Sequence, residues 1–212
     1  MSKGSFIFGL DVGTTKVCAV VGEVVEGALK IRGIGTSPST GIKKGVVVNI
    51  DPTVESIKKA VKEAESLTGV QIDAVHVGIT GDHIKGFNSY GAVGIRGEEV
   101  TPLDVERAIE SARALYIPLD REVLQVIPTG FILDGQDGIR DPVGMAGVRL
   151  EAKVHIITAG VSSVQNILKC CEKAGLEVIE IVFQPLASTE AVLTDDEREL
   201  GVAVVDIGGT TD

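Results

Sequence analysis

Hydrophobic residues at the start of the chain gather in three short segments that are separated by turn residues. Because the turns are short, we expect antiparallel hairpins, and the predicted strands are 5–11, 16–25 and 29–36. Apolar residues then recur at helical spacing between Asp51, a candidate N-cap, and Gly69, a stop signal. A fourth strand is predicted over 73–80.

The regular pattern resumes at Ser162 with a helix that ends at Gly175, a strand over 176–182 and a short helix opened by Pro185. The order of strand, strand, strand, helix, strand, helix, strand, helix is that of an RNase H type α/β unit. We therefore expect an α/β protein built on an actin/RNase H-like unit, in which a mixed five-stranded sheet is flanked by helices.

Residues between Gly81 and Gly160 interrupt this pattern. They contain a possible strand over 86–95, a helix capped by Thr101, and further extended segments at 123–133 and 147–158. Such an interruption indicates a small inserted α+β subdomain. An acidic linker at 194–199 then precedes a new apolar strand. The expected parts are 1–82 and 161–195 for the α/β unit, 83–160 for the inserted subdomain, and 196–212 for the start of a second, truncated lobe.

Composition narrows the classes of function. The chain has 20 Lys and Arg against 30 Asp and Glu, a formal net charge of −10, and 3% aromatic residues. Such a chain does not suit a long nucleic-acid track or a base-stacking platform. The cysteines lack disulfide or metal spacing, which indicates a reducing compartment, and no segment resembles a signal peptide or a transmembrane helix. We therefore expect a cytoplasmic protein without a nucleic-acid partner.

The pattern Asp-x-Gly followed by a pair of threonines occurs twice, each time behind an apolar strand. Such a turn presents backbone N–H groups without bulky side chains, and these groups can bind phosphate oxygens. One copy alone fits an ordinary hairpin turn, but two copies separated by a whole α/β unit favour a nucleotide site. Neither has the spacing of a Walker A loop or a Rossmann GxGxxG. The candidate nucleotide-binding residues are Asp11, Gly13, Thr14, Thr15, Lys16, Asp206, Gly208, Gly209, Thr210 and Thr211.

Four side chains add chemistry to this candidate site. Lys16 supplies a positive charge for phosphates, and the carboxylates of Asp11 and Asp206 suit a hydrated Mg²⁺, which prefers one or two carboxylates plus phosphate. Gln184 lies where a strand ends and a helix begins. A glutamine there either orients a water for attack on a γ-phosphate or simply caps the strand end. The residues thus indicate a nucleotide and magnesium as cofactors.

Longer segments of the chain resemble a known family. They are GLDVGTTKVCAVVGEV (9–24), GIKKGVVVNID (41–51), HVGITGDHIKGFNSYGAVGI (76–95), FQPLASTEAVL (183–193) and VAVVDIGGTTD (202–212). With the paired loops and the order of elements, they make the chain similar to the superfamily of actin, sugar kinases and heat-shock chaperones. Within it, the chain resembles the N-terminal half of the FtsA family of bacterial cell-division proteins, and 82–160 matches that family's inserted subdomain in position and size.

This resemblance implies an ATP-binding, actin-like protein that polymerises, links the ring of tubulin-like FtsZ to the cell membrane, and recruits later division proteins. It makes ATP and Mg²⁺ the expected cofactors and Gln184 the candidate catalytic residue, with at most weak ATPase activity. In that family a second lobe with the adenosine-binding motif and the main FtsZ contact, and then a lipid-binding C-terminal helix, follow the position of Asp212. We therefore expect this chain to bind ATP weakly and to reach the inner face of the membrane only through such a helix.

Two alternatives remain open within the superfamily. A small-molecule kinase needs a catalytic aspartate beside an acceptor pocket, and the inserted region offers no candidate. The pilus-assembly ATP-binding protein PilM shares the inserted subdomain, but the DVGTTK loop and the GIKKG segment favour the cell-division family. Within the insertion, the Gly-rich segment 135–147 is a candidate partner-binding loop, with Ile139, Val143 and Met145 expected to be exposed.

Overall fold

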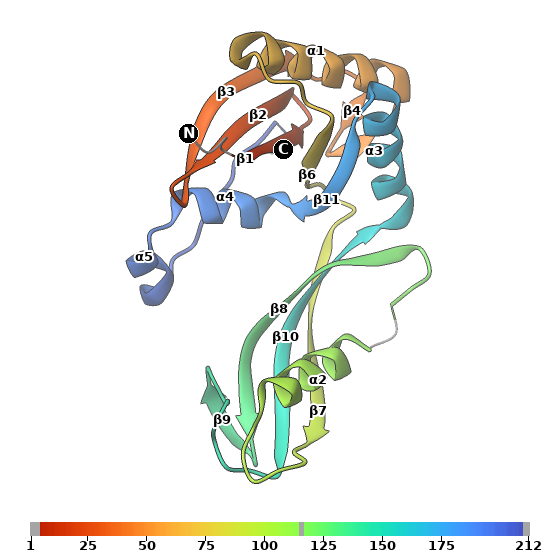
Figure 1. Ribbon diagram of the computed structural model, residues 1–212. Coiled ribbons are helices and arrows are strands. Elements are labelled where there is room, and N and C mark those ends of the chain that lie inside the picture. The colour runs from red at the N-terminus through yellow and green to blue at the C-terminus, as the bar shows by residue number, and fades with distance from the viewer. Residues whose placement is uncertain (1–4, 115–116, 210–212) are drawn as a thin grey trace. The chain divides into compact units, whose positions relative to one another are not determined.

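The computed structural model describes residues 5–114 and 117–209 (Figure 1). The chain divides into two compact units. Unit 1 consists of Met1–His83 and Ser162–Asp212, and unit 2 consists of Ile84–Val161. Each unit has its own sheet and its own helices, so each is a structural unit in itself.

Unit 1 is built on a mixed five-stranded sheet. In spatial order its strands are β11 (Glu177–Phe183), β6 (Ala74–Ile79), β1 (Ser5–Val12), β2 (Lys16–Val25) and β3 (Ala28–Pro38). Strands β1, β2 and β3 pair as antiparallel hairpins, whereas β6 is parallel to both β1 and β11. This arrangement confirms the predicted actin/RNase H-like unit. A separate small hairpin consists of β4 (Ile42–Lys43) and β5 (Val46–Val47).

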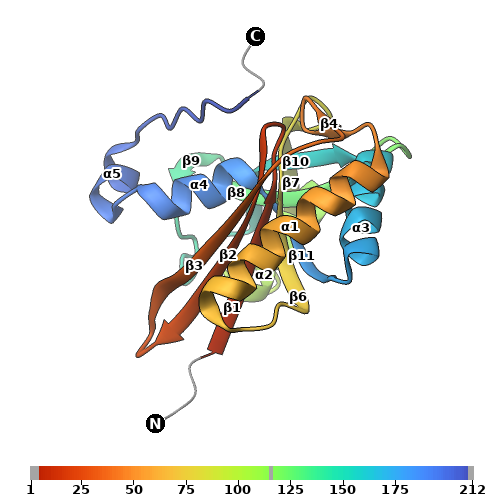
Figure 2. The same ribbon diagram turned by 90° about the horizontal axis from the view of Figure 1, so that it is seen from above.

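Helices of unit 1 follow the sheet strands in the expected order. They are α1 (Ile50–Thr68), α3 (Val161–Ala174), α4 (Gln184–Val192) and α5 (Asp195–Leu200). Helix α1 lies across the sheet and beside α3 (Figure 2), and Lys173 Nζ of α3 is 3.3 Å from Asp51 Oδ1 of α1. The expected N-cap is wrong: Asn49 precedes the helix, and Asp51 lies in its first turn, where a negative charge suits the helix dipole.

The acidic stretch 194–199 was expected to be a linker, and this is wrong because most of it forms α5. Thr194 and Glu197 make a capping box, in which the Thr194 hydroxyl accepts from the Glu197 N–H and the Glu197 carboxylate accepts from the Thr194 N–H. Two backbone N–H groups at the helix start are thereby satisfied. A charged run that begins with such a box therefore forms a helix although it buries no side chain.

The core of unit 1 lies between α1 and one face of the sheet. The buried residues of this core include Leu10, Val17, Val21 and Val77 on the strands and Ile57, Val61 and Ala64 on α1. Helix α1 approaches β3 closely because Gly35 has no side chain: a Cβ on Gly35 would overlap the Ala60 carbonyl oxygen and lie 3.0 Å from the Ala64 Cβ. This packing fixes β1 and β2, whose connecting turn is the first predicted phosphate loop.

Unit 2 is a four-stranded antiparallel sheet with one helix packed on it. In spatial order its strands are β7 (Lys85–Gly94), β10 (Arg149–Gly160), β8 (Arg121–Leu133) and β9 (Gln136–Ile139). Helix α2 (Pro102–Arg113) packs against β7 and β10 through buried Ala108 and Ala112. Its capping box joins Thr101 and Asp104, in agreement with the predicted cap. Strand β7 pairs with β10 and not with the sheet of unit 1, so the inserted residues have a sheet of their own.

Segment 135–147 was expected to be an exposed apolar loop, and this is wrong. Ile139 lies in β9, pairs with Phe131 and is buried. Met145 is partly buried against the same core, whereas Val143 is exposed. The strand expected after residue 201 is also wrong, since this segment lies outside every sheet of the described residues.

Within the ranges 5–114 and 117–209, no helix combines the length and the apolar character needed to cross a membrane.

Candidate functional site

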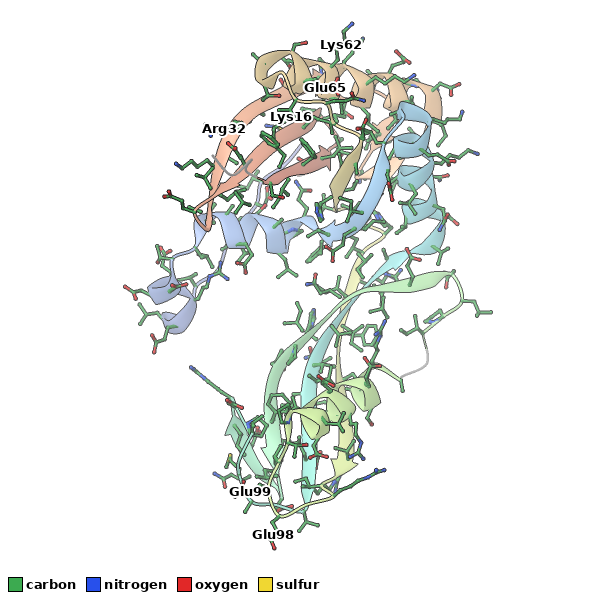
Figure 3. The ribbon with its side chains drawn as sticks, in the orientation of Figure 1. Lys16, Arg32, Lys62, Glu65, Glu98 and Glu99 are labelled. Atoms are coloured by element: carbon green, nitrogen blue, oxygen red, sulfur yellow. The ribbon has the colours of Figure 1, made fainter. Side chains whose placement is uncertain are left out.

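The first predicted phosphate loop is the tight turn between β1 and β2. The Gly13 N–H donates to the Lys16 carbonyl at 3.1 Å, which closes the turn, and a Cβ on Gly13 would lie 2.9 Å from the same oxygen. A side chain at this position would therefore force the turn open. Lys16 is the first residue of β2, and its side chain is exposed (Figure 3). The turn thus adds one exposed positive charge.

A cavity of about 430 Å³ in unit 1 brings the two predicted loops together. Gln184 and Pro185, at the start of α4, complete it, together with Thr80 at the end of β6. Its lining residues are Asp11, Gly13, Thr14, Thr15, Lys16, Thr80, Gln184, Pro185, Asp206, Ile207, Gly208 and Gly209. The predicted Thr210 and Thr211 lie outside the described residues. Residues more than 190 positions apart thus share one cavity, as the repeated pattern indicated.

The Asp11 carboxylate in the cavity has one oxygen atom that lacks a hydrogen-bond partner. Its Oδ1 atom is buried and has no hydrogen-bond partner. Burial raises the pKa of the Asp11 carboxyl above its ordinary value; the charge of Lys16 opposes this rise and the charge of Asp206 adds to it. A buried carboxylate oxygen without a donor, within electrostatic reach of a second carboxylate, fits a hydrated divalent cation.

The second loop packs directly on the first. A Cβ on Gly209 would overlap the Thr15 methyl group and lie 3.1 Å from the Thr15 Oγ1. The Asp206 carboxylate accepts a hydrogen bond from Ser188 Oγ of α4, with 3.2 Å between Oγ and Oδ2. The missing side chain at Gly209 therefore lets the second loop approach Thr15, and Ser188 of α4 holds the carboxylate of Asp206.

The hairpin of β4 and β5 supports the first loop from the side. The Gly45 N–H donates to Thr14 Oγ1 at 3.0 Å. Gly45 has φ 72°, which favours glycine, and a Cβ there would lie 2.8 Å from the Gly81 Cα. The hairpin tip is thus wedged between Thr14 and the end of β6, and the Thr14 hydroxyl keeps its own hydrogen for another acceptor.

Sequence reasoning missed several residues of this site. Thr80, Pro185 and Ile207 line the cavity, and Ser188 holds Asp206. Ser188 follows Gln184 by four residues, which places both on one helix face, and that spacing was the available signal. Among the described residues, no group of three or more His, Cys, Asp or Glu side chains could hold a metal ion by itself. The site therefore suits a cation that also takes ligands from water or phosphate.

The fold and the two facing loops place the chain in the class of actin-like proteins. This fold has a mixed sheet of RNase H-like order and is interrupted here by an inserted α+β unit. The inserted part also matches a family model described as "SHS2 domain inserted in FTSA" over residues 81–158. The chain belongs to the FtsA family of cell division proteins and corresponds to its N-terminal part.

Individual relatives carry this assignment. The chain is 53% identical over 212 residues to the cell division protein FtsA of Pseudomonas aeruginosa, covering 100% of this chain and 51% of the relative. It is 45% identical over 206 residues to FtsA of Escherichia coli K12, covering 97% and 49%, and 41% identical over 211 residues to FtsA of Bacillus subtilis, covering 99% and 48%. The chain spans about half the length of the curated relatives it matches.

Solved structures give the same fold from a more distant protein. A chain of the PilM-PilN type IV pilus biogenesis complex aligns with a TM-score of 0.60 at 18% identity, covering 87% of this chain and 49% of that one. At this identity the likeness concerns the fold alone. The much higher identity to cell division proteins favours the FtsA family over the PilM alternative.

Proposed function

We propose that unit 1 binds the phosphates of ATP with Mg²⁺, and that this site belongs to an actin-like cell division protein. The observation that carries the proposal is the shared cavity, in which two Asp-x-Gly loops from opposite ends of the chain face each other around the unpartnered Asp11 Oδ1. Neither loop alone distinguishes a phosphate site from a hairpin turn. Their meeting in one cavity favours the site.

Each loop has a distinct task in this proposal. The backbone N–H groups of Thr14 and Thr15, with the Lys16 ammonium, hold phosphate oxygens, because the glycine-lined turn leaves room for them. The Thr14 hydroxyl accepts from Gly45, so its hydrogen is free to be donated to a phosphate. Asp11 and Asp206 would hold a hydrated magnesium ion, which would neutralise charge on the phosphates.

Gln184 is the candidate catalytic residue. It lines the cavity at the start of α4, and Gly78 of β6 faces it, since a Cβ on Gly78 would lie 3.8 Å from the Gln184 Cβ and Cγ. The side-chain amide has both a donor and an acceptor, so it can orient a water that approaches a terminal phosphate. We expect only slow hydrolysis, because the Gln184 amide can orient a water but cannot take its proton.

At the level of the cell, we propose that the intact protein polymerises, links FtsZ to the membrane at its cytoplasmic face and recruits later division proteins. Membership of the FtsA family supports this role. The small-molecule kinase alternative has no support in unit 1, where the carboxylates of the cavity belong to the phosphate loops. The nucleotide would then govern assembly rather than supply a phosphate to a substrate.

The decisive experiment is titration of the chain with Mg-ATP by calorimetry or NMR. None of the described residues that line the cavity is aromatic, so a base has no ring to stack on, and we expect a dissociation constant above about 1 μM. Lys16→Ala should weaken binding about tenfold, the value of one charge-assisted contact. Lys62→Ala is the matched control, because Lys62 projects from the outer side of α1 (Figure 3).

Equal binding by the Lys16→Ala and Lys62→Ala variants would contradict the site. A dissociation constant of about 1 μM or smaller would contradict this expectation, since it would require a pocket for the adenine base that the cavity lining does not provide.

A further inference from the structure

Helix α4 contributes two polar side chains to the site from one face. Gln184 lines the cavity at the first position of the helix, and Ser188, one turn later, donates its hydroxyl hydrogen to Asp206 Oδ2 at 3.2 Å. Other polar groups of the helix are occupied elsewhere: the Thr189 hydroxyl donates to the Pro185 carbonyl at 2.7 Å, and Glu190 pairs with Arg198. Ser188 is thus the α4 hydroxyl that contacts the second phosphate loop.

The two immediate neighbours of Asp206 do little to fix the direction of that carboxylate. Val205 and Ile207, the two neighbours of Asp206, are 78% and 75% exposed, so neither is anchored in a core. The segment is also outside every sheet of the described residues. A carboxylate on such a segment rotates freely unless a hydrogen bond restrains it, and restraining it in the free protein removes that entropy loss from the binding step.

We propose that Ser188 is a positioning residue: it holds the Asp206 carboxylate beside Asp11 so that both carboxylates act on one hydrated magnesium ion. This inference rests on the proposed function. The Asp206 charge already acts on Asp11 across the cavity. The bond uses one lone pair of Oδ2 and leaves the other acceptor sites of the carboxylate for the water shell of the ion. Ser188 itself touches neither phosphate nor metal in this account.

The test is the dependence of ATP binding on magnesium. ATP is titrated into the 212-residue chain by NMR, once in EDTA and once in excess Mg²⁺, and the dissociation constant in EDTA divided by the dissociation constant in Mg²⁺ gives the magnesium coupling. We expect Ser188→Ala to lower this ratio about fivefold, the effect of losing one hydrogen bond to a charged group at an exposed site. The dissociation constant in EDTA should stay within about twofold of the wild type, because Ser188 does not contact the phosphates.

Two variants separate positioning from a general structural effect. Ser188→Thr keeps a hydroxyl and should restore the magnesium coupling. Ser66→Ala is the control, since the Ser66 hydroxyl is also exposed on a helix and donates to the Lys62 carbonyl four residues earlier. Alanine is the best helix former, so Ser188→Ala leaves α4 intact, and circular dichroism checks this.

Unchanged magnesium coupling in Ser188→Ala would overturn the inference, and so would an equal loss of affinity with and without magnesium. If the wild-type chain binds ATP through Lys16 and Ser188→Ala gives either of these results, the proposed function stands and only the role of Ser188 is removed. A wild-type chain without ATP binding removes both.

Discussion

Helix α2 packs directly against the backbone of β7 at Gly91, and replacing this glycine with alanine tests how unit 2 is packed. A Cβ on Gly91 would overlap the Ala112 nitrogen and the Ala108 oxygen and lie 2.7 Å from the Ala112 Cα. Both alanines are fully buried in the core of unit 2. The atoms in the way belong to helix backbone, so no side-chain rotation relieves the overlap.

The size of the effect follows from these contacts. Carbon atoms in contact are normally about 3.5–4.0 Å apart, so α2 must move outward by about 1 Å to admit the new methyl group. That movement loosens the packing of Ala108, Ala112 and the neighbouring Val105 and Ile109 on the sheet. We expect Gly91→Ala to lower the free energy of unfolding by about 3 kcal/mol, at the upper end of the range for overpacked cores.

Urea unfolding followed by tyrosine fluorescence measures this directly. The sequence has no Trp and two Tyr, Tyr90 and Tyr116, both within the range of unit 2. Gly94→Ala is the matched control on the same strand, because a Cβ on Gly94 meets nothing within 4 Å. The Gly91→Ala midpoint should fall by more than about 1 M urea while the control stays near the wild type. Midpoints of the two variants that agree within about 0.3 M would refute the packing argument.

Three further outcomes are expected. Gly35→Ala should destabilise unit 1 by about 3 kcal/mol in denaturation followed by circular dichroism, whereas Gly9→Ala, with no atom within 4 Å of its Cβ, should change little. Hydrogen bonds from the Thr101 hydroxyl and N–H hold the pKa of Asp104 below its usual range, so this stabilisation is present above the pKa of an unfolded aspartate and is lost as pH falls through the lowered value. Thr101→Ala should remove the hydroxyl bond and keep the N–H bond, and its acid unfolding midpoint should lie at higher pH than that of the wild type. Burial raises the pKa of the Cys171 thiol to about 12, so iodoacetamide at pH 8 should label it in urea and not in the native chain, and labelling at equal rates in both would contradict its burial.

Much of the fold could be predicted because local pattern and tertiary structure agree. Next to the tight turn, strands β1 and β2 alternate buried residues with mostly half-buried ones, and the predicted phosphate loop is that turn. Gln184 was found because a strand end followed by proline marks a helix start. These signals are local, and the sheet places them together without changing them.

The remaining features depend on contacts between distant segments. Thr80 lines the cavity only because β6 pairs in parallel with β1, and Ser188 matters only because Asp206 returns to α4. Ile139 looked exposed in a glycine-rich segment, but a short strand carries it into the core of unit 2. Glycine content indicates turns and close approach, and it does not tell which neighbour a nearby apolar side chain will meet.

The central claim is that two loops from opposite ends of the chain form one ATP site. Titration of the ¹⁵N-labelled chain with Mg-ATP, followed by two-dimensional NMR, tests it most directly. We predict that the amide signals of Gly13, Thr14 and Thr15 in the first loop and of Gly208 and Gly209 in the second shift together, with one dissociation constant. Shifts confined to one loop, or no shifts in either at millimolar Mg-ATP, would contradict it.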